Sequence, residues 1–129
     1  MILVDTSVWI NHFRKSDVGL AQLLADGSAG VHPFIVGELA CGNLKNRAAT
    51  LGDLARLPQT PIASETEVRH LVESSRLWGK GLGWIDLHLL AAAKLSGWGF
   101  FTADRALMHA AAAIGIAALG RKPLPTPRQ

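Results

Sequence analysis

The chain has 129 residues, of which 49% are hydrophobic and 18% are charged. This length allows one domain with a real core but not two, and the composition excludes an intrinsically disordered protein. Thirteen Lys and Arg stand against ten Asp and Glu, a formal net charge of +3. A basic surplus suits a polyanionic partner such as nucleic acid, although many soluble domains are mildly basic for solubility alone.

The sequence also bears on the compartment in which the protein works. Its apolar runs are short and interrupted by charge or glycine, so we expect no membrane span. The start lacks the basic leader of a signal peptide. Cys41 is the only cysteine, which excludes an internal disulfide and a cysteine-based zinc site. We therefore expect a cytoplasmic protein.

The predicted elements alternate between strands and helices. The opening run 1–4 is apolar throughout, as is typical of a strand buried on both faces of a parallel sheet. Strands are predicted at 1–4, 29–32, 62–63, 99–102 and 116–119. Helices are predicted in the segments 8–13, 20–24, 33–42, 44–55, 64–78, 84–96 and 105–113. Ser64 and Glu67 form a capping box, and Gly27 and Gly97 are suited to end the helices before them.

This alternation predicts an α/β fold, a three-layer α/β/α domain over residues 1–120 with a mainly parallel central sheet. Residues 121–129 contain three prolines and few apolar residues, and we expect them to be a disordered tail. Functional sites in such sheets gather at the carboxyl ends of the strands.

Two acids lie at such strand ends. Asp5 directly follows the first predicted strand, and Asp104 comes two residues after the strand that ends at Thr102. Each also precedes a predicted helix, so each could instead serve as a helix N-cap. For these two residues the sequence leaves both interpretations open.

Two other acids are predicted on apolar helix faces. Glu38 is expected to share a face with Ile35 and Cys41, and Asp86 to share one with Leu89. An ionised carboxylate that points toward a core costs several kcal/mol unless it is paired or binds a cation. No Lys or Arg falls on these faces near either acid.

Four carboxylates brought close together would repel one another unless a cation lies among them. Oxygen ligands favour Mg²⁺ or Mn²⁺ over zinc or copper. Such an ion lowers the pKa of bound water and neutralises charge on a phosphate. The residues Asp5, Glu38, Asp86 and Asp104 therefore predict metal-assisted hydrolysis of phosphodiester bonds.

In this order, the segments VDTSVWI, VGELA, WIDLHLLAAA and FFTADRAL resemble the four acidic motifs of the PIN domain, and the length resembles that of the VapC toxins of bacterial toxin–antitoxin pairs. The resemblance implies that the first three acids form the core of the site and that Asp104 completes it. It places supporting hydroxyls at Thr6, Ser7 and Thr102. It further implies an endoribonuclease that requires Mg²⁺ or Mn²⁺, is held inactive by a cognate antitoxin and forms a homodimer.

Other interpretations remain open. One is a non-catalytic PIN-like module that binds RNA or protein, but such a module has no reason to keep four acids in costly positions. Another is a metal-dependent phosphatase, although a haloacid-type enzyme would have an aspartate where Ser7 stands. Beside the predicted site, Lys80 and Trp84 are the residues most suited to contact a nucleotide.

Overall fold

The computed structural model describes residues 1–120, and the predicted tail at 121–129 lies outside the described residues. The strands are β1 (Ile2–Val4), β2 (Ala29–Gly30), β3 (Gly99–Thr102) and β4 (Ala118–Gly120). The helices are α1 (Thr6–Arg14), α2 (Val18–Ala25), α3 (Pro33–Ala40), α4 (Arg47–Arg56), α5 (Glu65–Ser74), α6 (Trp84–Ser96) and α7 (Arg105–Ala113). None of these helices is long and apolar enough to cross a membrane.

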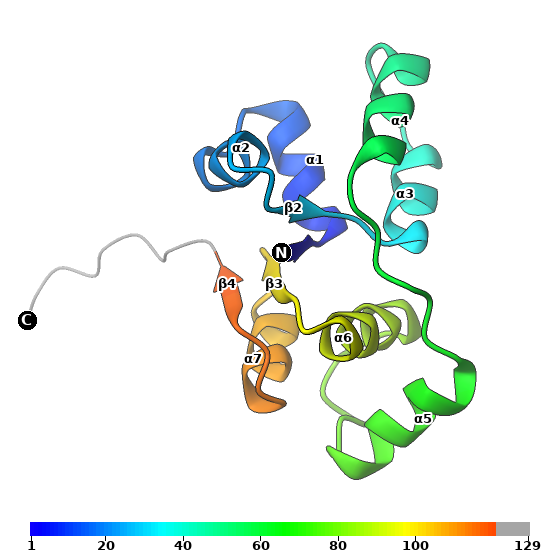
Figure 1. The fold of residues 1–129 in the computed structure, drawn as a ribbon. Coiled ribbons are helices and arrows are strands. Elements are labelled where there is room, and N and C mark those ends of the chain that lie inside the picture. The colour runs from blue at the N-terminus through cyan, green and yellow to red at the C-terminus, as the bar shows by residue number, and fades with distance from the viewer. Residues whose placement is uncertain (121–129) are drawn as a thin grey trace, which may run out of the picture.

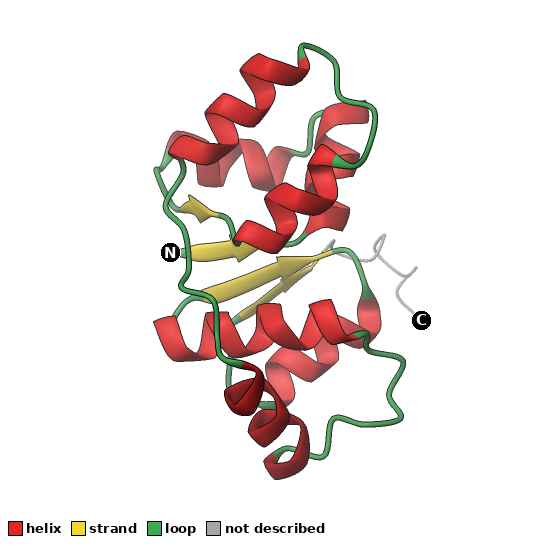
Figure 2. Ribbon diagram, turned by 90° about the vertical axis from the view of Figure 1, so that its right-hand side faces the viewer, coloured by secondary structure: helices red, strands yellow, loops and turns green. Residues whose placement is uncertain are grey.

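The architecture is the predicted three-layer one. Helices α1 to α4 lie on one side of the sheet and α5 to α7 on the other (Figures 1 and 2). Every strand pair is parallel, in the order β2-β1-β3-β4. The chain first adds β2 on one edge of β1 and then adds β3 and β4 on the other edge, so the strand order reverses at β1. Ligands of open parallel sheets bind at such a switch point, beyond the carboxyl ends of the strands.

The core forms where the central strands meet the helices on either face. Leu3, Val4 and Phe100 are completely buried. Helix α6 is buried along the whole run 87–93, because it packs between the sheet and α5. Close packing also explains Gly30 in β2, where a Cβ atom would lie 2.3 Å from the Trp98 ring.

Three predicted strands differ from the observed ones. The strand predicted at 29–32 ends at Gly30, because Val31 forms only an isolated bridge and His32 caps the next helix. The segment 62–63 is not a strand, and the preceding chain contributes only an isolated parallel bridge between Val31 and Gln59. Prolines at 58 and 61 both precede the segment 62–63 and cannot donate to a strand ladder. The last strand begins at Ala118 instead of 116, since Ile116 is buried in the core without pairing to a strand.

Candidate active site

Asp5 occupies the switch point between β1 and β3. It takes the N-cap position of α1, yet its side chain makes no capping hydrogen bond. Its Oδ2 instead accepts hydrogen bonds from Ser7 Oγ at 2.7 Å and from Thr102 Oγ1 at 2.8 Å. The side chain is only 7% exposed. The capping interpretation of Asp5 is therefore wrong, and its carboxylate is held by one side chain from α1 and one from the end of β3.

The two hydroxyls are themselves oriented by the backbone that follows β3. The Ala103 amide donates to Ser7 Oγ at 3.1 Å, and the Asp104 amide donates to Thr102 Oγ1 at 3.0 Å. Because each hydroxyl accepts from an amide, its single proton is free to be donated to Asp5. This network ties the loops after β1 and β3 together.

Asp104 is a helix cap. Its Oδ1 accepts a hydrogen bond from the Leu107 amide at 3.1 Å, in the first turn of α7. The capping interpretation therefore holds for this residue. Capping occupies one carboxylate oxygen, and Oδ2 has no hydrogen bond within residues 1–120. The same residue can thus cap α7 and contribute negative charge to the site.

Asp86 lies in the first turn of α6 and is half-buried, because the buried run of that helix begins one residue later, at Leu87. The predicted core-facing orientation was thus only partly correct. Its Oδ2 accepts from the Gly83 amide at 2.9 Å. Burial raises the pKa of the Asp86 carboxyl, the Gly83 hydrogen bond opposes that shift, and the negative charges of Asp5 and Asp104 raise the pKa further. Asp5 and Asp104 therefore both lie within electrostatic reach of Asp86.

Glu38 is exposed, which contradicts the prediction that it faces the core. Helix α3 buries Ile35 and Leu39, which are four residues apart, and this stripe leaves both Glu38 and Cys41 outside. Glu38 Oε1 accepts a hydrogen bond from Thr6 Oγ1 at 2.8 Å. Since Thr6 directly follows the first aspartate, this bond holds Glu38 at the rim of the same site.

The site is rich in carboxylate oxygens, the donors that Mg²⁺ and Mn²⁺ prefer. Within residues 1–120, no three His, Cys, Asp or Glu side chains lie close enough to hold an ion directly. Mg²⁺ usually binds through one or two carboxylates and keeps several waters. The donor set fits an ion held in that way, and ligation by all four acids stays a prediction.

Two histidines beside the site, His32 and His88, are buried. His32 Nδ1 accepts from the Phe34 amide at 2.9 Å and so caps α3. Burial, together with the nearby His88, lowers the pKa of His32 to about 4. Ring centroids are 4.8 Å apart for His32 and Phe34, 5.0 Å for Phe34 and His88, and 4.9 Å for His88 and Trp84. This row of rings joins α3, which carries Glu38, to α6, which carries Asp86. The position of His32 before a proline is the only feature of the sequence that indicates this arrangement.

A groove of about 650 Å³ lies next to Glu38, between α1 and the segment from α3 to α4. Its lining includes the partly exposed Ile10 and Phe13. Arg14 and Lys45 add positive charge to the same lining. The groove therefore combines apolar surface, basic groups and one acid of the site.

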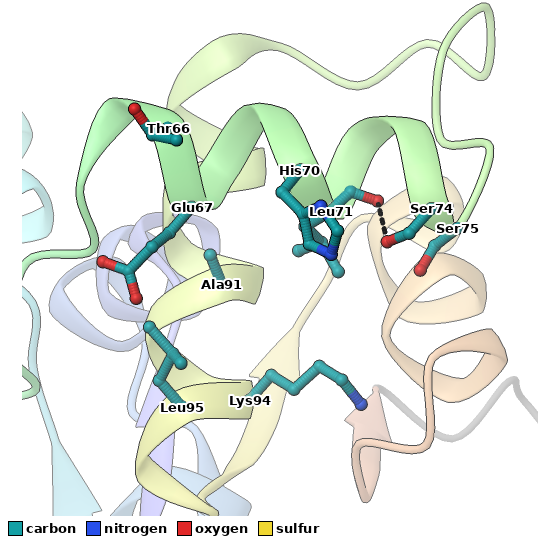
Figure 3. A pocket seen from close by; sticks show the side chains of 9 residues that line it. All are labelled: Thr66, Glu67, His70, Leu71, Ser74, Ser75, Ala91, Lys94 and Leu95. Atoms are coloured by element: carbon teal, nitrogen blue, oxygen red, sulfur yellow. Dashed lines mark hydrogen bonds between the residues drawn. The ribbon is translucent and has the colours of Figure 1, made fainter.

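A second groove, of about 510 Å³, lies between α5 and α6 and contains none of the four acids. Figure 3 shows side chains of both helices along it, with Leu71 and Leu95 among them. The Lys94 amine donates to the Ile114 carbonyl at 2.7 Å. This contact ties α6 to the end of α7.

Comparison with known proteins connects this architecture to a family. The family model described as PIN domain matches residues 2–113. The chain is 48% identical over 118 residues to Ribonuclease VapC32 of Mycobacterium tuberculosis, in each of two strains, covering 91% of this chain and 95% of that protein. Among solved structures, FitAB bound to an IR36 DNA fragment aligns with a TM-score of 0.64 and 16% identity, over 93% of this chain and 94% of the other. PAE2754 from Pyrobaculum aerophilum aligns with a TM-score of 0.57 and 17% identity, over 92% and 82% respectively.

Proposed function

Because the chain belongs to the PIN-domain family and is similar to a VapC ribonuclease over nearly its whole length, we propose that it is an endoribonuclease, the toxin of a toxin–antitoxin pair. It hydrolyses phosphodiester bonds of RNA at the carboxylates of Asp5, Glu38, Asp86 and Asp104. It acts in the cytoplasm, as a homodimer, and its activity requires Mg²⁺ or Mn²⁺.

The observation that supports this function best is the convergence of acids at the switch point. Asp5 and Asp104 follow the two central strands, and their charges add to the effect of burial in raising the pKa of Asp86 on α6. Like charges gathered in this way repel one another unless a cation lies among them. A bound divalent ion would lower the pKa of a water molecule and neutralise charge on the scissile phosphate.

The chain's own residues have defined tasks in this reaction. The Ser7 and Thr102 hydroxyls hold Oδ2 of Asp5, which fixes the direction of its other oxygen. The N–H of Gly83 holds Oδ2 of Asp86 in the same way. Such fixed carboxylates need little rearrangement to bind the ion and orient the phosphate.

A protein antitoxin is the partner we propose for the groove beside Glu38. Ile10 and Phe13 offer an apolar contact there, each about 40% exposed. An Arg or Lys side chain of the partner, placed among the acids, would occupy the position of the ion or the phosphate. Inhibition would then follow from charge neutralisation and blocked access together.

The test is cleavage of structured RNA by highly purified protein in Mg²⁺, in Mn²⁺ and in excess EDTA. We expect cleavage with either ion, none in EDTA, and a loss of several orders of magnitude in Asp86→Asn. Leu95→Ala, an exposed substitution away from the acids, serves as the matched control and should cleave normally. Undiminished cleavage in EDTA would contradict the metal mechanism. RNA binding without cleavage in any metal would instead favour a non-catalytic module.

A further inference from the structure

The segment 75–83, which we call the α5–α6 loop, leads directly into the helix that carries Asp86. Figure 2 shows this loop on the side of the sheet toward which the strand arrows point, the side where the acids lie. Leu77, 1% exposed, anchors the loop to the core. Trp78 in the loop and Trp84 at the start of α6 are 57% and 43% exposed. Two large aromatic side chains, one on the loop and one at the start of the helix that carries Asp86, are therefore accessible to a ligand.

The loop is also positively charged. It contains Arg76 and Lys80 and no acid, and both side chains are exposed. The only ion pair in the described part of the chain joins Arg56 to Asp53 on α4. No carboxylate of residues 1–120 therefore neutralises either loop cation. Exposed cations beside exposed aromatic rings form a surface complementary to an anion that carries flat rings.

The backbone at Arg76 adds an independent observation. Arg76 has φ +52°, in the left-handed region, where it ends α5 while the Leu77 amide bonds to the Val72 carbonyl at 3.0 Å. This position normally takes glycine, since a side chain is strained there. The loop does use glycine at its other left-handed positions, Gly79 and Gly81. An arginine in a strained conformation, exposed and without an ion pair among residues 1–120, points to a use for its side chain outside the fold.

We propose that the α5–α6 loop and Trp84 form a binding subsite for single-stranded RNA, which rests on the nuclease function proposed above. Trp78 and Trp84 stack against bases, and Arg76 and Lys80 bind the phosphates between them. Bases in a duplex present no free faces, whereas unpaired bases can stack on aromatic side chains. The loop therefore selects unpaired RNA and guides its backbone toward Asp86.

The experiment measures binding separately from cleavage. A fluorescein-labelled single-stranded oligoribonucleotide of about ten nucleotides, within the usual site size for single-strand binding, is titrated in EDTA and followed by anisotropy. The same strand annealed to its complement is the duplex probe. The variants are Trp78→Ala, Trp78→Phe and Arg76→Gly. Leu95→Ala, equally exposed at 57%, and Arg56→Ala, which removes a cation on α4, are the matched controls.

We expect Trp78→Ala to weaken single-strand binding about tenfold, as loss of one stacked base does. Trp78→Phe should recover part of that loss, and duplex binding should change little. Arg76→Gly should weaken binding yet melt at or above the wild-type temperature, because it relieves the left-handed strain. A residue with a merely structural role would not separate binding from stability in this way.

Equal single-strand affinity in Trp78→Ala, Arg76→Gly and the two controls would overturn the subsite. So would a wild-type protein that binds no single-stranded probe. If Trp78→Ala left RNA binding intact but reduced the molecular mass measured by light scattering, the surface would be an interface between copies of the chain instead. If the subsite variants weaken binding but no metal supports cleavage, the subsite stands and the nuclease function fails.

Discussion

Replacing Thr102 by valine should both destabilise the protein and disable its site. Valine keeps the branched shape of threonine in a position that is 1% exposed, but it removes the hydroxyl. That hydroxyl donates to Asp5 Oδ2 at 2.8 Å and accepts from the Asp104 amide at 3.0 Å. The substitution thus removes two hydrogen bonds without opening a cavity.

The size of the effect follows from what each bond contributes. A hydrogen bond to a charged carboxylate contributes about 1.5–3 kcal/mol, and one from a backbone amide about 1 kcal/mol. Their joint loss from Thr102→Val is about 3 kcal/mol in the free energy of unfolding. At about 4 °C per kcal/mol for a chain of this size, Tm should fall by about 12 °C. Thr102→Ser keeps the hydroxyl and should lose much less.

The assay combines urea unfolding at neutral pH with RNA cleavage in Mg²⁺, for the wild type and both Thr102 variants. Cleavage by Thr102→Val should fall at least about tenfold, since a misplaced carboxylate costs on the order of 1.4 kcal/mol or more in the transition state. Thr102→Ser should restore most of it. If Thr102→Val has the same midpoint urea concentration of unfolding as the wild type, the Asp5–Thr102 hydrogen bond contributes nothing to stability. The reasoning from the hydroxyl network would then fail.

Three further predictions concern other parts of the fold. Asp86→Asn should have a melting temperature at or above that of the wild type in EDTA, and Mg²⁺ should raise that temperature less than it does in the wild type. Because the pKa of Asp86 is raised, the free energy of unfolding of the wild type falls as pH rises through that pKa. A cation bound only to the folded state offsets this loss in the wild type. A clearly less stable variant in EDTA would make Asp86 a structural cap. The pKa of His32 is lowered to about 4, so protonation of this residue does not reduce the free energy of unfolding above pH 6.5. As pH falls toward 4, it should reduce that free energy by about 3 kcal/mol. His32→Asn, whose oxygen can still accept from the Phe34 amide, should flatten that dependence in urea unfolding at pH 7 and pH 4.5, and an unchanged slope would refute the assignment. Gly30→Ala should destabilise by about 1–3 kcal/mol, because its Cβ would meet the Trp98 ring at 2.3 Å; a wild-type Tm would show that the ring can move away.

Local sequence signals predicted the second half of the fold closely. The bounds 84–96, 99–102 and 105–113 were predicted and agree with α6, β3 and α7. Each boundary there depends on neighbours in the chain: Gly97 ends α6 at φ +68°, and Asp104 caps α7 through the amide of Leu107. Such signals act within one helical turn, so a sequence pattern contains them completely.

The strand predicted at 62–63 failed for a different reason. A short apolar pair carries no information about whether a partner strand lies alongside, and strand formation depends on that partner. The prediction that Glu38 lies on the buried face of its helix was wrong for a similar reason. The helical spacing of apolar residues in α3 is compatible with more than one apolar stripe, and packing against α1 and α4 selected the stripe through Ile35 and Leu39.

The residues of the site were selected from the sequence, but their geometry was decided by tertiary structure. Asp5 and Asp104 both precede helices, and nothing local distinguishes them. Asp104 caps its helix, whereas Asp5 bonds instead to the hydroxyl of Thr102, 97 residues away. That contact exists because β1 and β3 are parallel neighbours in the sheet. The sequence alone determined which acids stand at the ends of strands and helices, while the pairing of strands decided which of them share one electrostatic site, because charges couple through space and not along the chain.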